Sequence, residues 1–221
     1  MADESSGTTQ WEQRTVDRSL KAARQQAISK GNQFIAAAVE LLRTTGKADF
    51  TVLEVVEQAG MSLRAFYQHF ATKDDLLLAL VEVTIHQHAA SARRRVDAAT
   101  GPEGKLEALV RSMFGSQETD DPASRGLVLF HWHLADTRSA EFAATIRPYV
   151  EIVEGILEAG IAEGTFRTDL PVPAMAALMV HTLVSVLDMR VLGVHVSPDD
   201  VTADEMVRWC LSGVTGGAAP T

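Results

Sequence analysis

Polar and planar side chains gather on a helix that the sequence predicts just after Ser62, which can cap it. Phe66 and Phe70, four residues apart, share one face of that helix and can be buried together. The side chains left pointing outward are those of Leu63, Arg64, Tyr67 and Gln68. A helix of about two turns with such a free face fits the major groove of DNA, which is about 12 Å wide. Lys73, at the start of the following helix, can meet a phosphate, so the chemistry favoured here is recognition of double-stranded DNA.

Capping and stop signals predict the elements that would position this free face. Thr51 and Glu54 form a capping box at the start of one short helix, and Gly60 stands where that helix must end. A preceding helix over residues 28–45 presents a broad apolar face that can close a three-helix core. The pattern therefore predicts a helix-turn-helix DNA-binding domain over residues 28–73.

Three motifs stand in order along this part of the chain: FIAAAVELLRTTG at 34–46, T-V-x-x-V-x-x-x-A-G-M-S at 51–62, and F-Y-x-H-F-x-x-K-x-x-L-L at 66–77. Together they resemble the N-terminal domain of TetR-family transcriptional regulators. A plain αα-corner has a similar turn pattern, but the flanking motifs match as well, which favours the family. The apolar Leu63 and the long segment ahead of the first motif depart from the family pattern. The rest of the chain resembles the family in length and helical composition alone.

The resemblance implies roles for the matched side chains. Arg64 and Gln68 would reach base edges. The side chains that would mainly contact phosphates are those of Thr51, Tyr67, His69 and Lys73. The predicted DNA-binding set is Thr51, Ser62, Leu63, Arg64, Tyr67, Gln68, His69 and Lys73, joined by Arg18 and Lys21 from the preceding segment.

Residues 1–27 are expected to form a flexible basic arm. Arg14, Arg18 and Lys21 would share one side if the segment were helical. That side is either a solvated face or an arm that follows a phosphate strand or enters a minor groove. The net charge is −9, yet residues 14–73 hold nine Lys and Arg against five Asp and Glu. Basic charge thus gathers around the motifs, as expected when only one end of the molecule meets a polyanion.

The sequence predicts a larger helical domain for ligand binding and dimerisation over residues 74–213, and a disordered tail over 214–221. We expect an apolar pocket between helices around 102–117, 122–136 and 139–163. Its predicted lining is Met113, Phe114, Phe130, Trp132, His133 and Met179. These residues favour a flexible, largely apolar effector with one or two polar handles. The histidines could instead be satisfied groups of a core.

Two helices are expected to join copies of the chain. The helix over 173–192 is apolar on most faces, so it needs a partner besides its own core. Together with the helix over 139–163 it would form a four-helix bundle in a homodimer. His181, Asp188 and Arg190 interrupt the apolar run, so we expect no membrane span. A dimer would read a palindromic operator through two half-sites.

The fold class predicted is all-α, and the function predicted is a ligand-responsive transcriptional regulator, a repressor released from its operator by a small, largely apolar effector. One alternative is a DNA-binding architectural protein without a ligand. Another is a helical enzyme, because His133 and Asp136 lie three residues apart and could act as acid and base, although no nucleophile accompanies them. No zinc-ligand spacing or phosphate-binding loop predicts a metal or cofactor. A single cysteine and an N-terminus without a signal-peptide pattern favour a cytoplasmic location.

Overall fold

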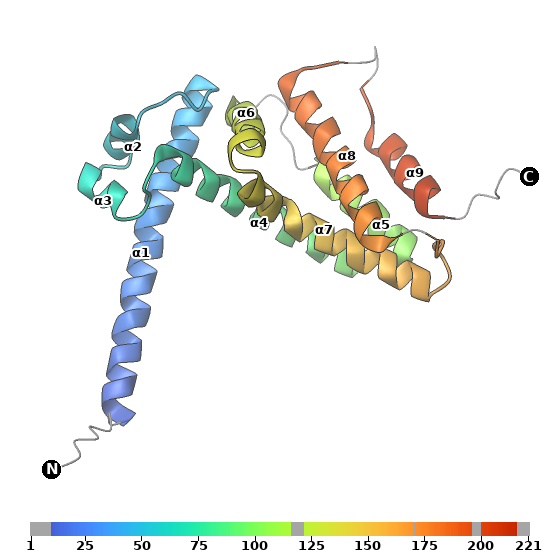
Figure 1. Ribbon diagram of the computed structural model, residues 1–221, viewed down its shortest axis with the longest axis horizontal. Helices are drawn as coiled ribbons and strands as arrows, with labels where there is room; N and C mark the ends of the chain where they lie inside the picture. The colour runs from blue at the N-terminus through green and yellow to red at the C-terminus, as the bar shows by residue number, and fades with distance from the viewer. Residues whose placement is uncertain (1–9, 116–121, 170, 196–199, 216–221) are drawn as a thin grey trace, which may run out of the picture.

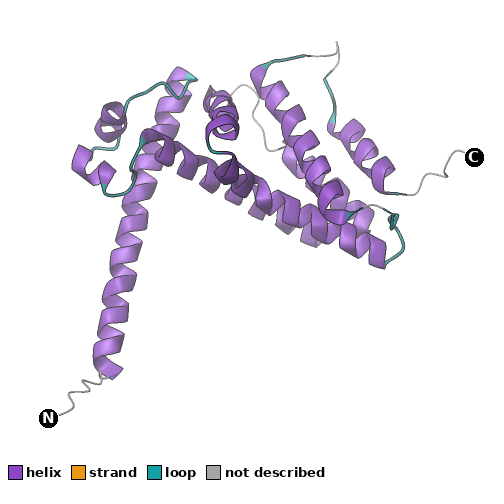
Figure 2. Ribbon diagram, viewed as in Figure 1, coloured by secondary structure: helices purple, strands orange, loops and turns teal. Residues whose placement is uncertain are grey.

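The computed structural model describes residues 10–115, 122–169, 171–195 and 200–215, and within these ranges every regular element is an α-helix (Figure 2). The helices are α1 (Gln10–Thr45), α2 (Val52–Gln58), α3 (Leu63–Tyr67), α4 (Lys73–Ala98), α5 (Gly101–Gly115), α6 (Pro122–Thr137), α7 (Ser139–Ala162), α8 (Val172–Leu192) and α9 (Ala203–Val214). The all-α prediction is confirmed. The expectations for residues 1–9 and 216–221 lie outside the described residues.

The helices form two groups that α4 joins (Figure 1). Helices α2 and α3 lie beside the C-terminal half of α1, whose other half projects away from the molecule. Helix α4 leads from α3 into a second group made of α5, α7, α8 and α9. Helix α6 lies between the groups, since it contacts α1 on one side and α7 and α8 on the other.

Local sequence explains how α2 and α3 begin and where the turn between them falls. The Thr51 hydroxyl accepts a hydrogen bond from the Glu54 amide at 3.2 Å, and the Glu54 carboxylate accepts one from the Thr51 amide at 2.6 Å. Gly60 takes a left-handed conformation, with φ of 64°, directly after α2. Phe34 and Phe66 are fully buried, and their rings meet edge to face at 5.4 Å. This aromatic pair fixes α3 against α1.

The N-terminal core extends beyond the predicted boundary at residue 73. It includes Leu76, Leu77, Leu78, Leu80 and Val81 of α4 and, from α6, Ala123, Phe130 and Leu134. Gly126 lets α6 approach α1 closely, because a Cβ at that position would lie 2.6 Å from the Leu42 side chain. Helix α6 is apolar nearly all round, so it can cover this core with one face and the C-terminal group with another.

Helix α1 begins well before the predicted start near Ile28. Residues 10–27 continue the same helix, since no proline interrupts the segment and the only glycine of α1 is Gly31. Every described side chain between residues 10 and 28 is exposed, including the apolar Trp11. The described part of the predicted arm is therefore an exposed helical extension.

Helix α8 keeps an exposed apolar side. It is long and apolar enough to cross a membrane by length and composition alone, yet residues such as Met179 and Leu183 are fully buried in the C-terminal core. Only 28% of its most apolar stretch of 18 residues is buried inside the chain. Most of the other residues of α8 are partly buried, and Leu178 is 53% exposed.

Candidate functional site

Helix α3 presents the outward side chains that the sequence predicts. The Ser62 hydroxyl accepts a hydrogen bond from the Ala65 amide at 3.1 Å and so caps the helix. Phe66 points into the core, while Leu63 and Tyr67 are 45% and 56% exposed. Arg64 and Gln68 are also exposed. The structure brings these four side chains together on the free side of the helix-turn-helix unit.

Lys73 has a structural contact that its sequence position does not reveal. Its ammonium donates a hydrogen bond to the Ala48 carbonyl at 2.9 Å and lies 5.6 Å from the centre of the Phe50 ring. The side chain therefore ties the start of α4 to the segment between α1 and α2. Its remaining N–H groups are the ones that could meet a phosphate, and that contact stays a prediction.

His69 and Thr51 are also held by neighbours. The His69 ring lies 6.1 Å from Phe34 and 6.5 Å from Phe70, both in edge-to-face geometry. Its Nε2 atom is buried and has no hydrogen-bond partner among the described residues. The Thr51 amide and the Thr51 hydroxyl both donate to the Glu54 carboxylate, at 2.6 Å and 2.8 Å. These two hydrogen bonds hold the pKa of Glu54 below its usual value. The predicted phosphate contacts of both residues stay predictions.

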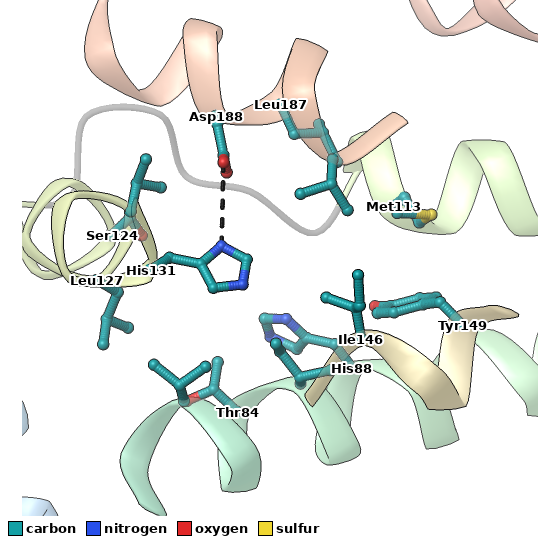
Figure 3. Close-up of a pocket in the computed structure, with 14 residues that line it drawn as sticks. Thr84, His88, Met113, Ser124, Leu127, His131, Ile146, Tyr149, Leu187 and Asp188 are labelled. Atoms are coloured by element: carbon teal, nitrogen blue, oxygen red, sulfur yellow. Dashed lines mark ion pairs between the residues drawn. The ribbon is translucent and has the colours of Figure 1, made fainter. Parts of the chain in front are cut away.

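A cavity of about 150 Å³ lies in the C-terminal group beside α6 (Figure 3). Five helices supply its walls. They contribute Val81, Thr84, Ile85 and His88 from α4, Met113 from α5, Ser124, Leu127, Val128 and His131 from α6, Ile146 and Tyr149 from α7, and Val184, Leu187 and Asp188 from α8. Most of these side chains are apolar, and the polar ones come from four different helices.

The cavity wall, as far as the structure describes it, includes Met113 but not the other five residues predicted to line the pocket. Phe130 belongs to the N-terminal core, and Met179 is buried in the C-terminal core. Phe114 lies under the Arg190 guanidinium, 5.3 Å from its ring centre. The face of α6 that lines the cavity carries Ser124, Leu127, Val128 and His131, not the predicted Phe130, Trp132 and His133.

The other two predicted lining residues are on the outer side of α6. Trp132 is 52% exposed. His133 faces Asp74 of α4, with Nε2 3.6 Å from the carboxylate, and both side chains are nearly half exposed. The pair proposed for an enzyme, His133 with Asp136, thus has its histidine directed toward another carboxylate.

Helical spacing could have identified the wall. The cavity residues of α4 recur at i, i+3, i+4 and i+7 over residues 81–88, and those of α6 do the same over residues 124–131. This spacing places each set on a single helix face. Polar residues at the last position of each stripe, His88 and His131, mark the faces that meet.

Two titratable groups meet at one end of the cavity. The His131 Nδ1 atom lies 3.9 Å from the Asp188 carboxylate, beyond hydrogen-bond distance, and Figure 3 marks this pair with a dashed line. Burial lowers the pKa of His131 to about 4. Burial raises the pKa of Asp188 to about 7, with the Trp132 side chain opposing the rise through a hydrogen bond. At neutral pH the imidazole is therefore uncharged, and the carboxyl group is near its midpoint.

The described residues contain no group of three or more His, Cys, Asp or Glu side chains placed to bind a metal ion. His88, on the α4 side of the cavity, has its pKa lowered by burial. The only cysteine, Cys210, is buried on α9, and burial raises the pKa of its thiol to about 11. The cavity has a mostly apolar wall with a few polar groups, which is typical of sites that bind small molecules.

Comparison with curated proteins finds regulators. The regulator BetI of Stenotrophomonas maltophilia is 31% identical over 99 residues, which cover 44% of this chain and 50% of BetI. The repressor KstR2 of Rhodococcus jostii is 26% identical over 192 residues, covering 85% of this chain and 90% of KstR2. The chain thus spans about half the length of the BetI proteins that it matches.

Solved structures share the fold. The fatty acid degradation regulator FadR from Bacillus halodurans superposes with a TM-score of 0.67 at 22% identity, covering 86% of this chain and 96% of FadR. FadR from Bacillus subtilis in complex with stearoyl-CoA gives a TM-score of 0.68 at 20% identity, covering 82% and 97%. Residues 34–80, which include α2, α3 and the start of α4, match the family described as bacterial regulatory proteins, tetR family. Over these residues the chain is similar to the tetR family of bacterial regulatory proteins.

Proposed function

We propose that the chain is a homodimeric, cytoplasmic transcriptional repressor that a small molecule releases from a palindromic DNA operator. The observation that carries this proposal is the exposed face of α3, fixed by the buried Phe34 and Phe66 within the segment that matches the tetR family. The cavity beside α6 favours a ligand-responsive regulator over an architectural protein without a ligand. The KstR2 relatives, which are named repressors, support repression rather than activation.

Arg64 is proposed to read a base edge from the exposed face of α3. Arg64→Ala should weaken binding to the selected operator by about 1–3 kcal/mol and relax the preference at one base position. Binding-site selection from a random DNA library, followed by fluorescence anisotropy, measures both effects. Arg208→Ala, at an exposed position of α9, is a matched control that should leave the selected sequence unchanged. An unchanged motif from the Arg64→Ala protein would contradict the assignment.

The helical extension of α1 is proposed to contact the DNA backbone through Arg14, Arg18 and Lys21, which are exposed. Replacing all three by alanine removes six cationic side chains from the dimer, so the slope of log affinity against log salt should become shallower by up to about 5.4, or about 0.9 for each phosphate that the variant no longer neutralises. Operator titrations at several salt concentrations measure this slope. The selected sequence should not change, and an unchanged slope would place the extension away from DNA.

The exposed side of α8 is proposed to form the dimer interface together with α7. Ala174, Leu178, His181 and Ser185 recur at helical spacing and are all exposed. This exposed stripe, which carries Leu178 among small and polar residues, would let two copies pack as a four-helix bundle. The two recognition helices would then have to lie ~34–36 Å apart to enter successive major grooves.

Ligand control is proposed to pass through both α4 and α6. Each helix packs into the N-terminal core with one part and lines the cavity with another, as Leu80 and Thr84 illustrate for α4. On α6, Phe130 lies in the core while His131 faces the cavity. A compound that favours a different spacing of these two helices would therefore shift the positions of both recognition helices.

Filling the cavity should remove the response to ligand. Met113→Trp adds an indole to the cavity wall, so it should weaken ligand binding by at least about tenfold, which corresponds to about 1.4 kcal/mol. Operator affinity without ligand should stay nearly intact, because Met113 belongs to the C-terminal core. Leu129→Trp, at an exposed position of α6, is the control and should keep the response. Equal affinity of a true ligand for free and operator-bound dimer would contradict the mechanism.

A further inference from the structure

Asp188 carries a buried carboxyl group that has no cationic partner in the cavity. Its side chain is only 13% exposed. Among the described residues that line the cavity, none is lysine or arginine. The nearby Arg190 guanidinium lies over Phe114, and Arg125 donates to the Leu192 carbonyl at 2.8 Å. Because an ionised carboxylate is costly to bury without an opposite charge, this site is electrostatically incomplete.

His131 leaves a second polar group unsatisfied at the same end of the cavity. The residue is 9% exposed, and its Nε2 atom has no hydrogen-bond partner in the part of the chain that the structure describes. Figure 3 shows this edge of the ring directed into the space between α6, α4 and α7, while Nδ1 faces Asp188. A neutral imidazole whose Nδ1–H points at a carboxylate presents Nε2 as a hydrogen-bond acceptor. The cavity thus offers one acceptor without a donor, His131 Nε2, and one carboxyl group, that of Asp188, which accepts a hydrogen bond from the Trp132 side chain but faces no lysine or arginine among the described cavity residues.

The size of the cavity limits the ligand. A volume of about 150 Å³ is similar to that of an engineered cavity that holds benzene. The cavity wall includes Ile85 and Ile146, which suit an apolar body. A ligand that fills this space therefore has about the bulk of a single ring.

We propose that the cavity binds a small organic cation, an amine with an apolar body of about one ring. Asp188 supplies the counter-charge for the ammonium group, and His131 Nε2 accepts a hydrogen bond from an N–H group. A carboxylate or phosphate ligand would instead place a like charge beside Asp188 with no cation to balance it. That such an amine is the effector rests on the proposed function, whereas its binding does not.

The charge of Asp188 makes the affinity depend on pH. An ammonium ligand binds the ionised carboxylate, which has a pKa of about 7 in the free protein. Two other titratable groups of the wall keep their charge state between pH 6 and 8, since the pKa of His131 is about 4 and that of Tyr149 is about 12, while burial lowers the pKa of His88 and so favours its neutral form. Affinity for an amine that stays protonated should therefore rise about tenfold from pH 6 to pH 8.

Three probes of nearly equal size test the proposal: benzylamine, benzyl alcohol and benzoate. Isothermal titration calorimetry on the full-length protein without DNA should show benzylamine binding at least about tenfold more tightly than the other two at pH 8. Asp188→Asn should abolish this preference, and Asp136→Asn, an exposed carboxylate on α6, should leave it unchanged. Benzoate binding as tightly as benzylamine, a preference that survives in Asp188→Asn, or no benzylamine binding at millimolar concentration would overturn the proposal. Equal binding of benzyl alcohol would overturn it in favour of a neutral ligand.

A separate measurement distinguishes failure of this inference from failure of the proposed function. Operator affinity is measured by anisotropy with and without benzylamine. Amine binding that leaves operator affinity unchanged would keep the cation site and remove the proposed release mechanism. If the protein binds the operator but does not bind the amine, the proposed DNA-binding function stands and the proposed cation site is wrong.

Discussion

Phe66→Ala should lower the free energy of unfolding of the N-terminal group by about 3–5 kcal/mol, the usual cost of removing a buried aromatic side chain. Phe66 is fully buried, and its ring meets Phe34 at 5.4 Å, Tyr67 at 5.4 Å and Phe70 at 5.6 Å. No other residue of α3 itself is buried, so a cavity here detaches the helix. Urea denaturation followed by circular dichroism measures the loss, and operator binding should disappear with it.

The exposed neighbour Leu63 provides the control. Leu63→Ala should change the free energy of unfolding by no more than about 0.5 kcal/mol, because the side chain is 45% exposed. Phe66→Leu keeps most of the apolar volume and should recover a large part of the lost stability and of the operator affinity. Equal stability of the Phe66→Ala and Leu63→Ala proteins would contradict the role of Phe66.

The helix-turn-helix unit was readable from sequence because its determinants are local. The capping box predicted at Thr51 is present, and Thr72 and Thr202 begin α4 and α9 with the same motif, which depends on residues only three positions apart. Phe66 turned inward as its spacing predicts, and it left Arg64 and Tyr67 outside. Such local signals do not predict long-range contacts. One example is the hydrogen bond that the Lys73 ammonium donates to the Ala48 carbonyl, 25 positions away.

Of the six residues predicted to line a ligand pocket, the described cavity wall includes Met113. Helix α6 is apolar on nearly every side, so hydrophobicity alone does not reveal which side faces a cavity and which side packs on α1. The packing of Gly126 against Leu42 turns Phe130 toward the N-terminal core, and this turns His131 toward Asp188. That contact joins α6 to α1, over 80 positions away in the chain, and periodicity carries no information on it.

Asp188→Asn and His131→Gln should change the pH dependence of stability in opposite directions. Burial raises the pKa of Asp188 from 3.8 to about 7, so the folded state holds this proton more tightly than the unfolded chain, and its contribution to stability falls as pH rises from about 4 to about 7. Burial lowers the pKa of His131 from 6.5 to about 4, so the unfolded chain takes up the proton first, and this contribution falls as pH drops from about 6.5 to about 4. In the wild-type protein the two slopes largely cancel over the shared range.

In each variant, the free energy of unfolding should depend on pH as the remaining titratable group dictates. At pH 8, Asp188→Asn should be more stable than wild type by up to about 4 kcal/mol, from about three pKa units at about 1.4 kcal/mol each, and this gain should vanish near pH 4. His131→Gln should gain up to about 3 kcal/mol near pH 4 and nothing at pH 8. Urea denaturation at several pH values gives these differences. The surface pair His195 and Asp200, 2.7 Å apart and more than half exposed, is the control, and Asp200→Asn should shift stability by no more than about 1 kcal/mol at any pH. A change in packing alone does not depend on proton concentration. If Asp188→Asn therefore raised the free energy of unfolding equally at pH 4 and pH 8, the carboxyl group would not be buried in its charged form.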